Sequence, residues 1–228
     1  MGKIGIKFNH NYFEHIDSEE KSYFLGFIMA DGCVIKDRNS LAIKIHKKDE
    51  HILESFKECI EFEGDLWYHK QRTNMCQISM SHVKLKEDLN NLGVVSNKTH
   101  TLKFPKLRKD LYRHFIRGFF DGDGCVRIKK DKRRSGSVDK RGDVRFVCGS
   151  LGFLNDLNIL LHKEIDTNLN KLYGKYESHK YIGWCGFSDI ENLYEYFYND
   201  ANLFLHRKKL IFDEVYNICK QRNKYRKK

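Results

Sequence analysis

An internal repeat constrains this chain more than any other feature of its sequence. The stretch GFIMADGCVIK, which begins at Gly26, returns as GFFDGDGCVRIK at Gly118, and the equivalent residues Asp31 and Asp123 lie 92 positions apart. A pattern that returns at this distance predicts two related structural units. The chain has 228 residues, so each half is long enough to bury a core of its own.

The segments after each copy of the repeat also follow one order, which is strand, helix, hairpin and closing helix. In the first half we expect them at Leu41–His46, Glu50–Cys59, the hairpin strands Leu66–Tyr68 and Met75–Met80, and His82–Leu92. In the second half they fall at Val144–Cys148, Phe153–His162, the hairpin strands Leu172–Tyr176 and Tyr181–Phe187, and Asp189–Tyr198. The sequence therefore predicts an α+β fold of two pseudo-symmetric αββαββα halves with antiparallel sheets.

The boundary between the halves falls near the only proline. We predict an N-terminal half over residues 1–99, a linker over 100–110 that contains Pro105, and a C-terminal half over 111–228 that ends in a basic tail. The tail, Arg222–Lys228, has five basic residues and no acidic one, which is typical of a disordered segment that contacts a nucleic-acid backbone.

Composition limits the class of binding partner and the cellular compartment that we expect. The net charge is +11 and the pI is about 9.2, which favours a polyanionic partner with nucleic acid first, although charge alone does not separate DNA from RNA or an anionic membrane. No apolar run approaches the roughly 20 residues of a membrane helix, and the N-terminus has no apolar signal core. We expect a cytoplasmic protein that stays in the compartment where it is made, and not a secreted one. The seven cysteines form no C-x-x-C pair, so reduced thiols are expected.

The repeat places a carboxylate at an unfavourable position twice. We expect the first helix to begin at an Asp17 N-cap and to end at a left-handed Gly32, so Asp31 and Asp123 each stand at a helix C-terminus. The helix dipole disfavours a carboxylate there by about 0.3–1 kcal/mol. A lone Asp-Gly is usually a turn, but two equivalent ones favour a bound cation. Small residues leave one side of each helix bare, which predicts backbone-to-backbone packing with the two carboxylates close together: Gly26, Ala30, Gly118 and Gly122.

These two helices resemble the motif of the LAGLIDADG homing endonucleases, in the single-chain form with two motifs. The copies read FLGFIMADG over Phe24–Gly32 and IRGFFDGDG over Ile116–Gly124. Met29 departs from the pattern, because the family often has an acidic residue there, but both copies keep the carboxylate before the final glycine. Further family-like stretches are Asn97-Lys98-Thr99, Phe104-Pro105, His114–Gly118 and Arg207-Lys208-Lys209.

The resemblance implies a site-specific, Mg²⁺-dependent endonuclease that acts as a monomer on a long asymmetric double-stranded DNA target. It would hydrolyse one phosphodiester per strand across the minor groove. Mn²⁺ is expected to substitute for Mg²⁺, and Ca²⁺ to support binding without cutting. The residues implied are catalytic Asp31, Asp123, Lys98 and Lys208, with metal ligands Asp31, Asp123, Ala30 and Gly122. Each lysine is equally consistent with a solvated surface charge.

The DNA-binding surface is expected on two saddle-like sheets, because a two-stranded antiparallel ribbon fits the major groove. Basic residues alternate along the strands or gather in the loop after the second motif: Lys44, Lys70, Arg72, Arg127, Lys129, Arg133, Arg134 and Arg145. For the third strand of the first half, two faces stay open as the DNA-binding one. One carries Tyr68, Lys70 and Arg72, and the other carries Trp67, His69 and Gln71.

Two other functions stay open at this point. The same fold serves intron maturases, with host intron RNA as partner, and DNA-binding regulators that have lost the chemistry. Asp31 and Asp123 together favour the nuclease over the regulator, because a non-cutting protein needs neither, but nothing in the sequence separates nuclease from maturase. The chain extends little beyond the two motif halves, so we expect a free-standing enzyme rather than an intact intein. No membrane partner is expected.

Overall fold

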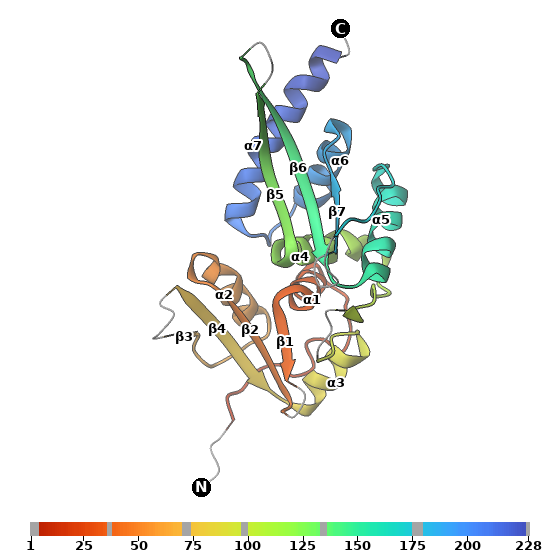
Figure 1. Ribbon diagram of the computed structural model, residues 1–228. Helices are drawn as coiled ribbons and strands as arrows, with labels where there is room; N and C mark the ends of the chain where they lie inside the picture. Colours follow the sequence, from red (N-terminus) through yellow and green to blue (C-terminus); the bar gives the residue numbers. More distant parts are fainter. Residues whose placement is uncertain are drawn as a thin grey trace. The chain divides into compact units, whose positions relative to one another are not determined.

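The computed structural model describes residues 5–35, 38–69, 74–96, 100–132, 136–174 and 180–226. The chain forms two compact units (Figure 1). Unit 1 comprises residues 1–98 and 105–122, and unit 2 comprises residues 99–104 and 123–228. These units differ from the predicted halves 1–99 and 111–228, because the second motif helix packs on the first and so groups with unit 1. Within the described residues, none of the helices has the length and apolarity needed to span a bilayer.

Unit 1 holds both motif helices and a four-stranded antiparallel sheet of order β1-β2-β4-β3. The helix α4 belongs to it as far as Gly122. In chain order its elements are α1 (Glu19–Asp31), β1 (Gly32–Ile35), β2 (Ser40–His46), α2 (Glu50–Cys59), β3 (Trp67–Tyr68), β4 (Met75–Ser81), α3 (Val83–Asn91) and α4 (Tyr112–Asp123). The order of elements follows the prediction, and α2 has the predicted bounds.

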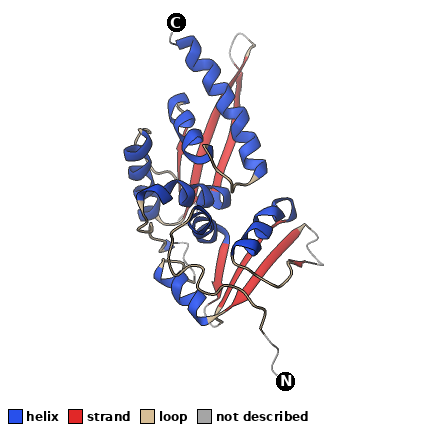
Figure 2. Cartoon of the chain, turned by 180° about the vertical axis from the view of Figure 1, so that it is seen from behind, coloured by secondary structure: helices blue, strands red, loops and turns tan. Residues whose placement is uncertain are grey.

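One face of this sheet is packed against helices. In β2, Leu41, Ile43 and Ile45 are buried, while Lys44 alternates with them onto the other face. Helices α1 and α2 contact β2 on the buried side, and Figure 2 shows α2 lying across the strands. The alternation in sequence therefore decides which side chains are left toward solvent.

Helices α1 and α4 pack backbone to backbone through their glycines. A Cβ atom built on Gly26 would lie 2.0 Å from the carbonyl oxygen of Phe115, and one built on Gly118 would lie 2.0 Å from that of Tyr23. Such approaches are open only to glycine, since real Cβ atoms need more than 3 Å from these atoms. All residues of α1 from Ser22 to Met29 are buried. The packing predicted from the small residues is confirmed.

The ends of α1 differ in detail from the sequence expectation. Ser18, rather than Asp17, is the N-cap, and its hydroxyl accepts a hydrogen bond from the backbone N–H of Lys21 at 3.3 Å. Gly32 does not adopt a left-handed conformation; its φ is −77°, and the chain passes directly into β1. A Cβ on Gly32 would lie 2.6 Å from Ile28, so close approach, and not positive φ, requires the glycine.

Unit 2 has a three-stranded antiparallel sheet of order β5-β6-β7. Its elements are β5 (Gly124–Lys132), β6 (Val138–Cys148), α5 (Leu151–Ile165), β7 (Lys180–Trp184), α6 (Phe187–Tyr198) and α7 (His206–Arg226). Helices α6 and α7 contact one face of the sheet, as Figures 1 and 2 show. The predicted first strand of the second hairpin is reduced to a single bridge between Tyr173 and Tyr181, and residues 175–179 lie outside the described residues.

The C-terminal segment corrects one expectation. Arg222–Lys228 was expected to be a disordered tail, but α7 continues to Arg226. The guanidinium of Arg222 forms an ion pair with the buried Asp139 of β6 and lies 5.4 Å from the ring centroid of Phe187. Through Arg222, these contacts hold α7 against β6 and α6.

The glycine packing gives a stability prediction. Gly26→Ala is expected to lower the free energy of unfolding by about 3 kcal/mol or more, because the new methyl group meets rigid backbone rather than a side chain that can turn away. Urea unfolding followed by circular dichroism measures this.

Gly152→Ala in α5 is the matched control, because the nearest atom to its built Cβ is 4.0 Å away. It is expected to be neutral or stabilising by up to about 1 kcal/mol. Equal effects of the two substitutions would contradict the close packing of α1 and α4.

Candidate functional site

The first motif carboxylate, Asp31, is the last residue of α1 and is exposed. Across from it in unit 1, a Cβ built on Gly122 would lie 2.3 Å from the Cβ of Ala30 and 3.4 Å from Oδ2 of Asp31. The absence of a side chain at Gly122 therefore leaves the space beside the Asp31 carboxylate open. The predicted ligand positions Asp31, Ala30 and Gly122 come together at this point.

The second motif carboxylate, Asp123, is the last residue of α4, is half-buried and belongs to unit 2. The next residue, Gly124, begins β5, and its carbonyl oxygen accepts a hydrogen bond from Nζ of Lys208 at 2.7 Å. Lys208 is buried, so the structure places this predicted residue beside the end of the second motif and not on the solvated surface. Its counterpart, Lys98, lies outside the described residues.

A buried polar network ties the two motif helices together. The fully buried Arg117 donates from Nη2 to Oε1 of Glu19 at 2.7 Å, and its guanidinium lies 5.5 Å from the ring centroid of Tyr23. The hydroxyl of Tyr23 in turn donates to Oδ2 of the buried Asp121 at 2.8 Å. Burial lowers the pKa of Arg117, against the opposing attraction of Glu19, Tyr23 and Asp121.

Sequence reasoning missed this network, although a signal was present. At the equivalent positions, Leu25 of the first motif becomes Arg117 in the second, and Met29 becomes Asp121. Both changes place a charge on a helix face that is otherwise apolar. Two opposite charges that appear together in one copy of a repeat indicate an ionic network, and this comparison would have found it.

On the sheet of unit 1, Lys44 has the expected orientation. It pairs with Gln77 of β4, which pairs in turn with Trp67 of β3, so the three side chains share the face that is away from the helices. The indole of Trp67 is 55% exposed, and its ring lies 3.9 Å from that of His69. Nε2 of His69 is 3.4 Å from Oε1 of Gln77.

Of the two faces left open for the third strand, the structure selects the one with Trp67 and His69. Tyr68 is on the other side: its hydroxyl donates a hydrogen bond to Glu50 of α2, and Nζ of Lys47 lies 5.0 Å from its ring centroid. Lys70 and Arg72, which were placed with Tyr68, lie outside the described residues and stay predictions.

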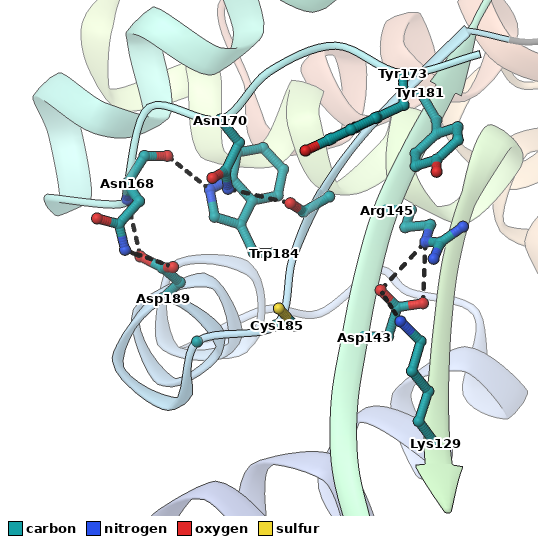
Figure 3. Close-up of a pocket in the computed structure, with 12 residues that line it drawn as sticks. Lys129, Asp143, Arg145, Asn168, Asn170, Tyr173, Tyr181, Trp184, Cys185 and Asp189 are labelled. Carbon is teal, nitrogen blue, oxygen red and sulfur yellow. Dashed lines mark hydrogen bonds and ion pairs between the residues drawn. The ribbon is translucent and has the colours of Figure 1, made fainter. Parts of the chain in front are cut away.

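On the sheet of unit 2, three predicted DNA-binding residues meet at one carboxylate. Asp143 of β6 accepts from Nε of Arg127 at 2.6 Å and from Nε of Arg145 at 3.1 Å, and Nζ of Lys129 lies 3.4 Å away. Figure 3 shows Lys129 and Arg145 on either side of it. Burial alone would raise the pKa of Asp143, but the hydrogen bonds from the two arginines outweigh it and hold the pKa below the ordinary value. The loop residues Arg133 and Arg134 lie outside the described residues.

Known proteins share features of this sequence and of this fold. Residues 110–198 match the family model described as LAGLIDADG-like domain. The structure of the LAGLIDADG meganuclease I-AabMI bound to uncleaved DNA aligns with a TM-score of 0.62 at 18% identity, over 88% of this chain and 91% of that one. The LAGLIDADG homing endonuclease I-LtrWI bound to target DNA aligns with a TM-score of 0.60 at 14% identity, over 93% and 92%. The chain thus has the LAGLIDADG meganuclease fold.

Curated relatives match over part of their length only. The chain is 24% identical over 163 residues to the replication factor C small subunit of Methanocaldococcus jannaschii and 32% identical over 144 residues to the reverse gyrase of Pyrococcus horikoshii. It matches a probable translation initiation factor IF-2 of M. jannaschii at 24% over 168 residues. These matches cover 8%, 7% and 13% of the three proteins. The chain therefore spans only a small part of each of these relatives.

The donor set of the LAGLIDADG motifs suits a hard cation that keeps water ligands. Among the described residues, no group of three or more His, Cys, Asp or Glu side chains is close enough to hold a metal ion. At the end of the first motif, the carboxylate of Asp31 lies beside the space that Gly122 leaves, and this carboxylate and nearby backbone carbonyls would be the oxygens offered to a cation. Mg²⁺ accepts a coordination shell of this kind, in which a few protein oxygens are completed by several water molecules.

A cavity of about 400 Å³ opens beside the basic cluster of unit 2 (Figure 3). Its polar walls are already hydrogen-bonded within the protein: Asp189 accepts from the backbone and side-chain nitrogens of Asn168, and Nδ2 of Asn170 donates to the Gly183 carbonyl. The guanidinium of Arg145 lies 4.6 Å from the ring centroid of Tyr181 at its rim. This contact with Tyr181 helps to fix the orientation of Arg145 at the rim of the cavity.

The network between the motif helices is testable by a double-mutant cycle. Arg117→Met is expected to lower the free energy of unfolding by about 3 kcal/mol, because it leaves Glu19 and the buried Asp121 without their cation. The double variant with Glu19→Gln is expected to lose less than the sum of the single losses, as urea unfolding would measure. Strict additivity would contradict the ion pair.

The Asp143 cluster predicts a pH dependence of stability. Because the folded pKa of Asp143 is depressed below the ordinary 3.8, its stabilisation is fully present above that value and is lost as the pH falls through the folded pKa. The difference in unfolding free energy between the wild type and Asp143→Asn is therefore expected to be largest near neutral pH and to shrink below about pH 4. Urea unfolding at several pH values measures it, and a constant difference would contradict the prediction.

Proposed function

We propose that this chain is a site-specific, Mg²⁺-dependent endonuclease that hydrolyses one phosphodiester in each strand of a long asymmetric DNA duplex, across the minor groove. The observation that carries the proposal is that each LAGLIDADG helix ends in an aspartate, Asp31 or Asp123, with Ala30 of α1 packed against Gly122 of α4. A protein that only binds DNA has no need of either carboxylate at a position that the helix dipole disfavours.

The sheets support a duplex DNA partner. Lys44 lies on one sheet face away from the helices, and Arg127, Lys129 and Arg145 share a face in unit 2. Antiparallel ribbons of this kind fit the major groove, and the net charge of +11 favours a polyanion. I-AabMI and I-LtrWI, which share the fold, are bound to DNA in their structures. Because both motifs are in one chain, we propose that it acts as a monomer, on DNA in the compartment where it is made.

The metal is proposed to bind at the motif ends. Asp31 and Asp123 would hold it with the carbonyls of Ala30 and Gly122, and when bound it would activate water and stabilise the departing 3′-oxygen. I-SmaMI, another protein of this fold, is bound to its uncleaved DNA target in the presence of calcium ions. We propose that Ca²⁺ likewise supports DNA binding here without cutting, and that Mn²⁺ substitutes for Mg²⁺.

Lys208 is proposed to supply positive charge beside the second carboxylate. Its Nζ is held at 2.7 Å from the carbonyl oxygen of Gly124, the residue after Asp123. An ammonium fixed at this point is placed to orient the attacking water or to offset charge that develops on the phosphate. Lys98 is proposed to act in the same way in the first half.

The carboxylate assignment is tested on a target obtained by cleavage selection from a randomised duplex library with Mg²⁺. Asp31→Asn and Asp123→Asn are each expected to reduce double-strand cutting by at least about 100-fold, the lower range for loss of a key electrostatic group. Binding to the selected duplex in Ca²⁺ is expected to stay within a few-fold of wild type, as fluorescence anisotropy would measure.

Asp131→Asn is the matched control, because it removes one negative charge from an exposed position of β5. It is expected to cut normally. Full cutting by both motif variants would reject the assignment, and a wild type that binds structured RNA but no duplex would favour the maturase.

A further inference from the structure

The basic cluster of unit 2 is built in two layers. Arg127 and Lys129 of β5, with Asp143 and Arg145 of β6, lie on one sheet face, since Arg127 and Asp143 are register partners and side chains alternate with period two. The side chain of Asp143 is only 6% exposed, whereas those of Arg127, Lys129 and Arg145 are 49%, 40% and 24% exposed. The carboxylate thus lies beneath three cations that face solvent.

A surface that only attracts phosphate gains nothing from this carboxylate. Asp143 cancels one of the three positive charges, and the hydrogen bonds from the arginines keep its pKa low, so it stays charged. What it adds is a fixed orientation for two flexible side chains. It contacts each arginine through Nε, and so does not use the paired Nη groups.

Arg145 is held from a second side as well. Its guanidinium lies 4.6 Å from the ring centroid of Tyr181 on β7. A guanidinium held in this way loses less conformational entropy when it binds. The Nη pair is also the group that an arginine commonly offers to O6 and N7 of guanine in the major groove.

We propose that Asp143 is a specificity-determining positioning residue: it holds Arg127 and Arg145 in the orientations in which they read base edges beneath the β5–β6 hairpin. The inference rests on the proposed DNA-binding function. It assigns the sequence preference at a few adjacent base pairs to a residue that touches no DNA itself.

The test compares binding-site selection by wild type, Asp143→Asn and Asp131→Asn from one randomised duplex library in Ca²⁺. For Asp143→Asn, the ratio of affinities for the selected duplex and a scrambled one is expected to fall about 10-fold, with base preference lost at a few adjacent positions only. Affinity for scrambled DNA is expected to be unchanged or higher, because a negative charge is gone.

Asp131→Asn makes the same change of charge on the same sheet, at a side chain that is 58% exposed and contacts only Arg141 at 3.7 Å among the described residues. Its affinity ratio is expected to match that of wild type. An unchanged ratio for folded Asp143→Asn, or a preference lost evenly over the whole site, would overturn the inference.

If the thermal melt shows that Asp143→Asn does not fold, the variants Arg127→Lys and Arg145→Lys test the inference instead. Both keep the charge but lose the guanidinium fork, and they are expected to lose preference at a few adjacent positions while their affinity for scrambled DNA stays at the wild-type level. Selection unaffected by either would overturn the inference. If the wild type itself selects no sequence, the proposed function fails, which is a different result from a selective wild type with an unaltered Asp143→Asn.

Discussion

The contact between the backbones of α1 and α4 is the constraint on which unit 1 depends. The built Cβ positions at Gly26 and Gly118 lie 2.0 Å from carbonyl oxygens of the opposite helix, so no other residue fits without separating the helices. This packing brings Ala30 against Gly122 and leaves open space beside Asp31. It also explains why α4 groups with the first half of the chain, although the repeat assigns it to the second.

At two positions where the motifs diverge, the side chains of the second motif connect the two helices. Tight backbone packing leaves little room for adjustment, and the larger side chains around it must fit without strain. The second motif supplies Arg117 and Asp121 where the first has Leu25 and Met29. Together with Glu19 and Tyr23 they form a buried network that fixes one helix on the other. The LAGLIDADG helix pair is therefore chemically asymmetric, even though its glycine contacts follow the repeat.

On the sheet of unit 2, the acidic residue Asp143 has a role that the amino-acid composition does not indicate. The segment after the second motif is mostly basic, and Asp143 appears there as a minority charge. In the fold it is the buried centre of Arg127, Lys129 and Arg145. Basic residues that alternate along a strand are easily identified, but the partner that orients them belongs to the neighbouring strand, and its role depends on the register.

Local patterns with a fixed spacing were enough to predict the two-fold repeat, the order of elements, the carboxylate at each motif end and the glycine faces. They also indicated Lys44, Arg127, Lys129 and Arg145 as basic positions on strands. Three facts became visible in the fold alone: Trp67 rather than Tyr68 shares the face of Lys44, Lys208 is buried beside Gly124, and Asp143 joins three cations. Those facts depend on strand register and on contacts between residues far apart in the chain, which no local pattern encodes.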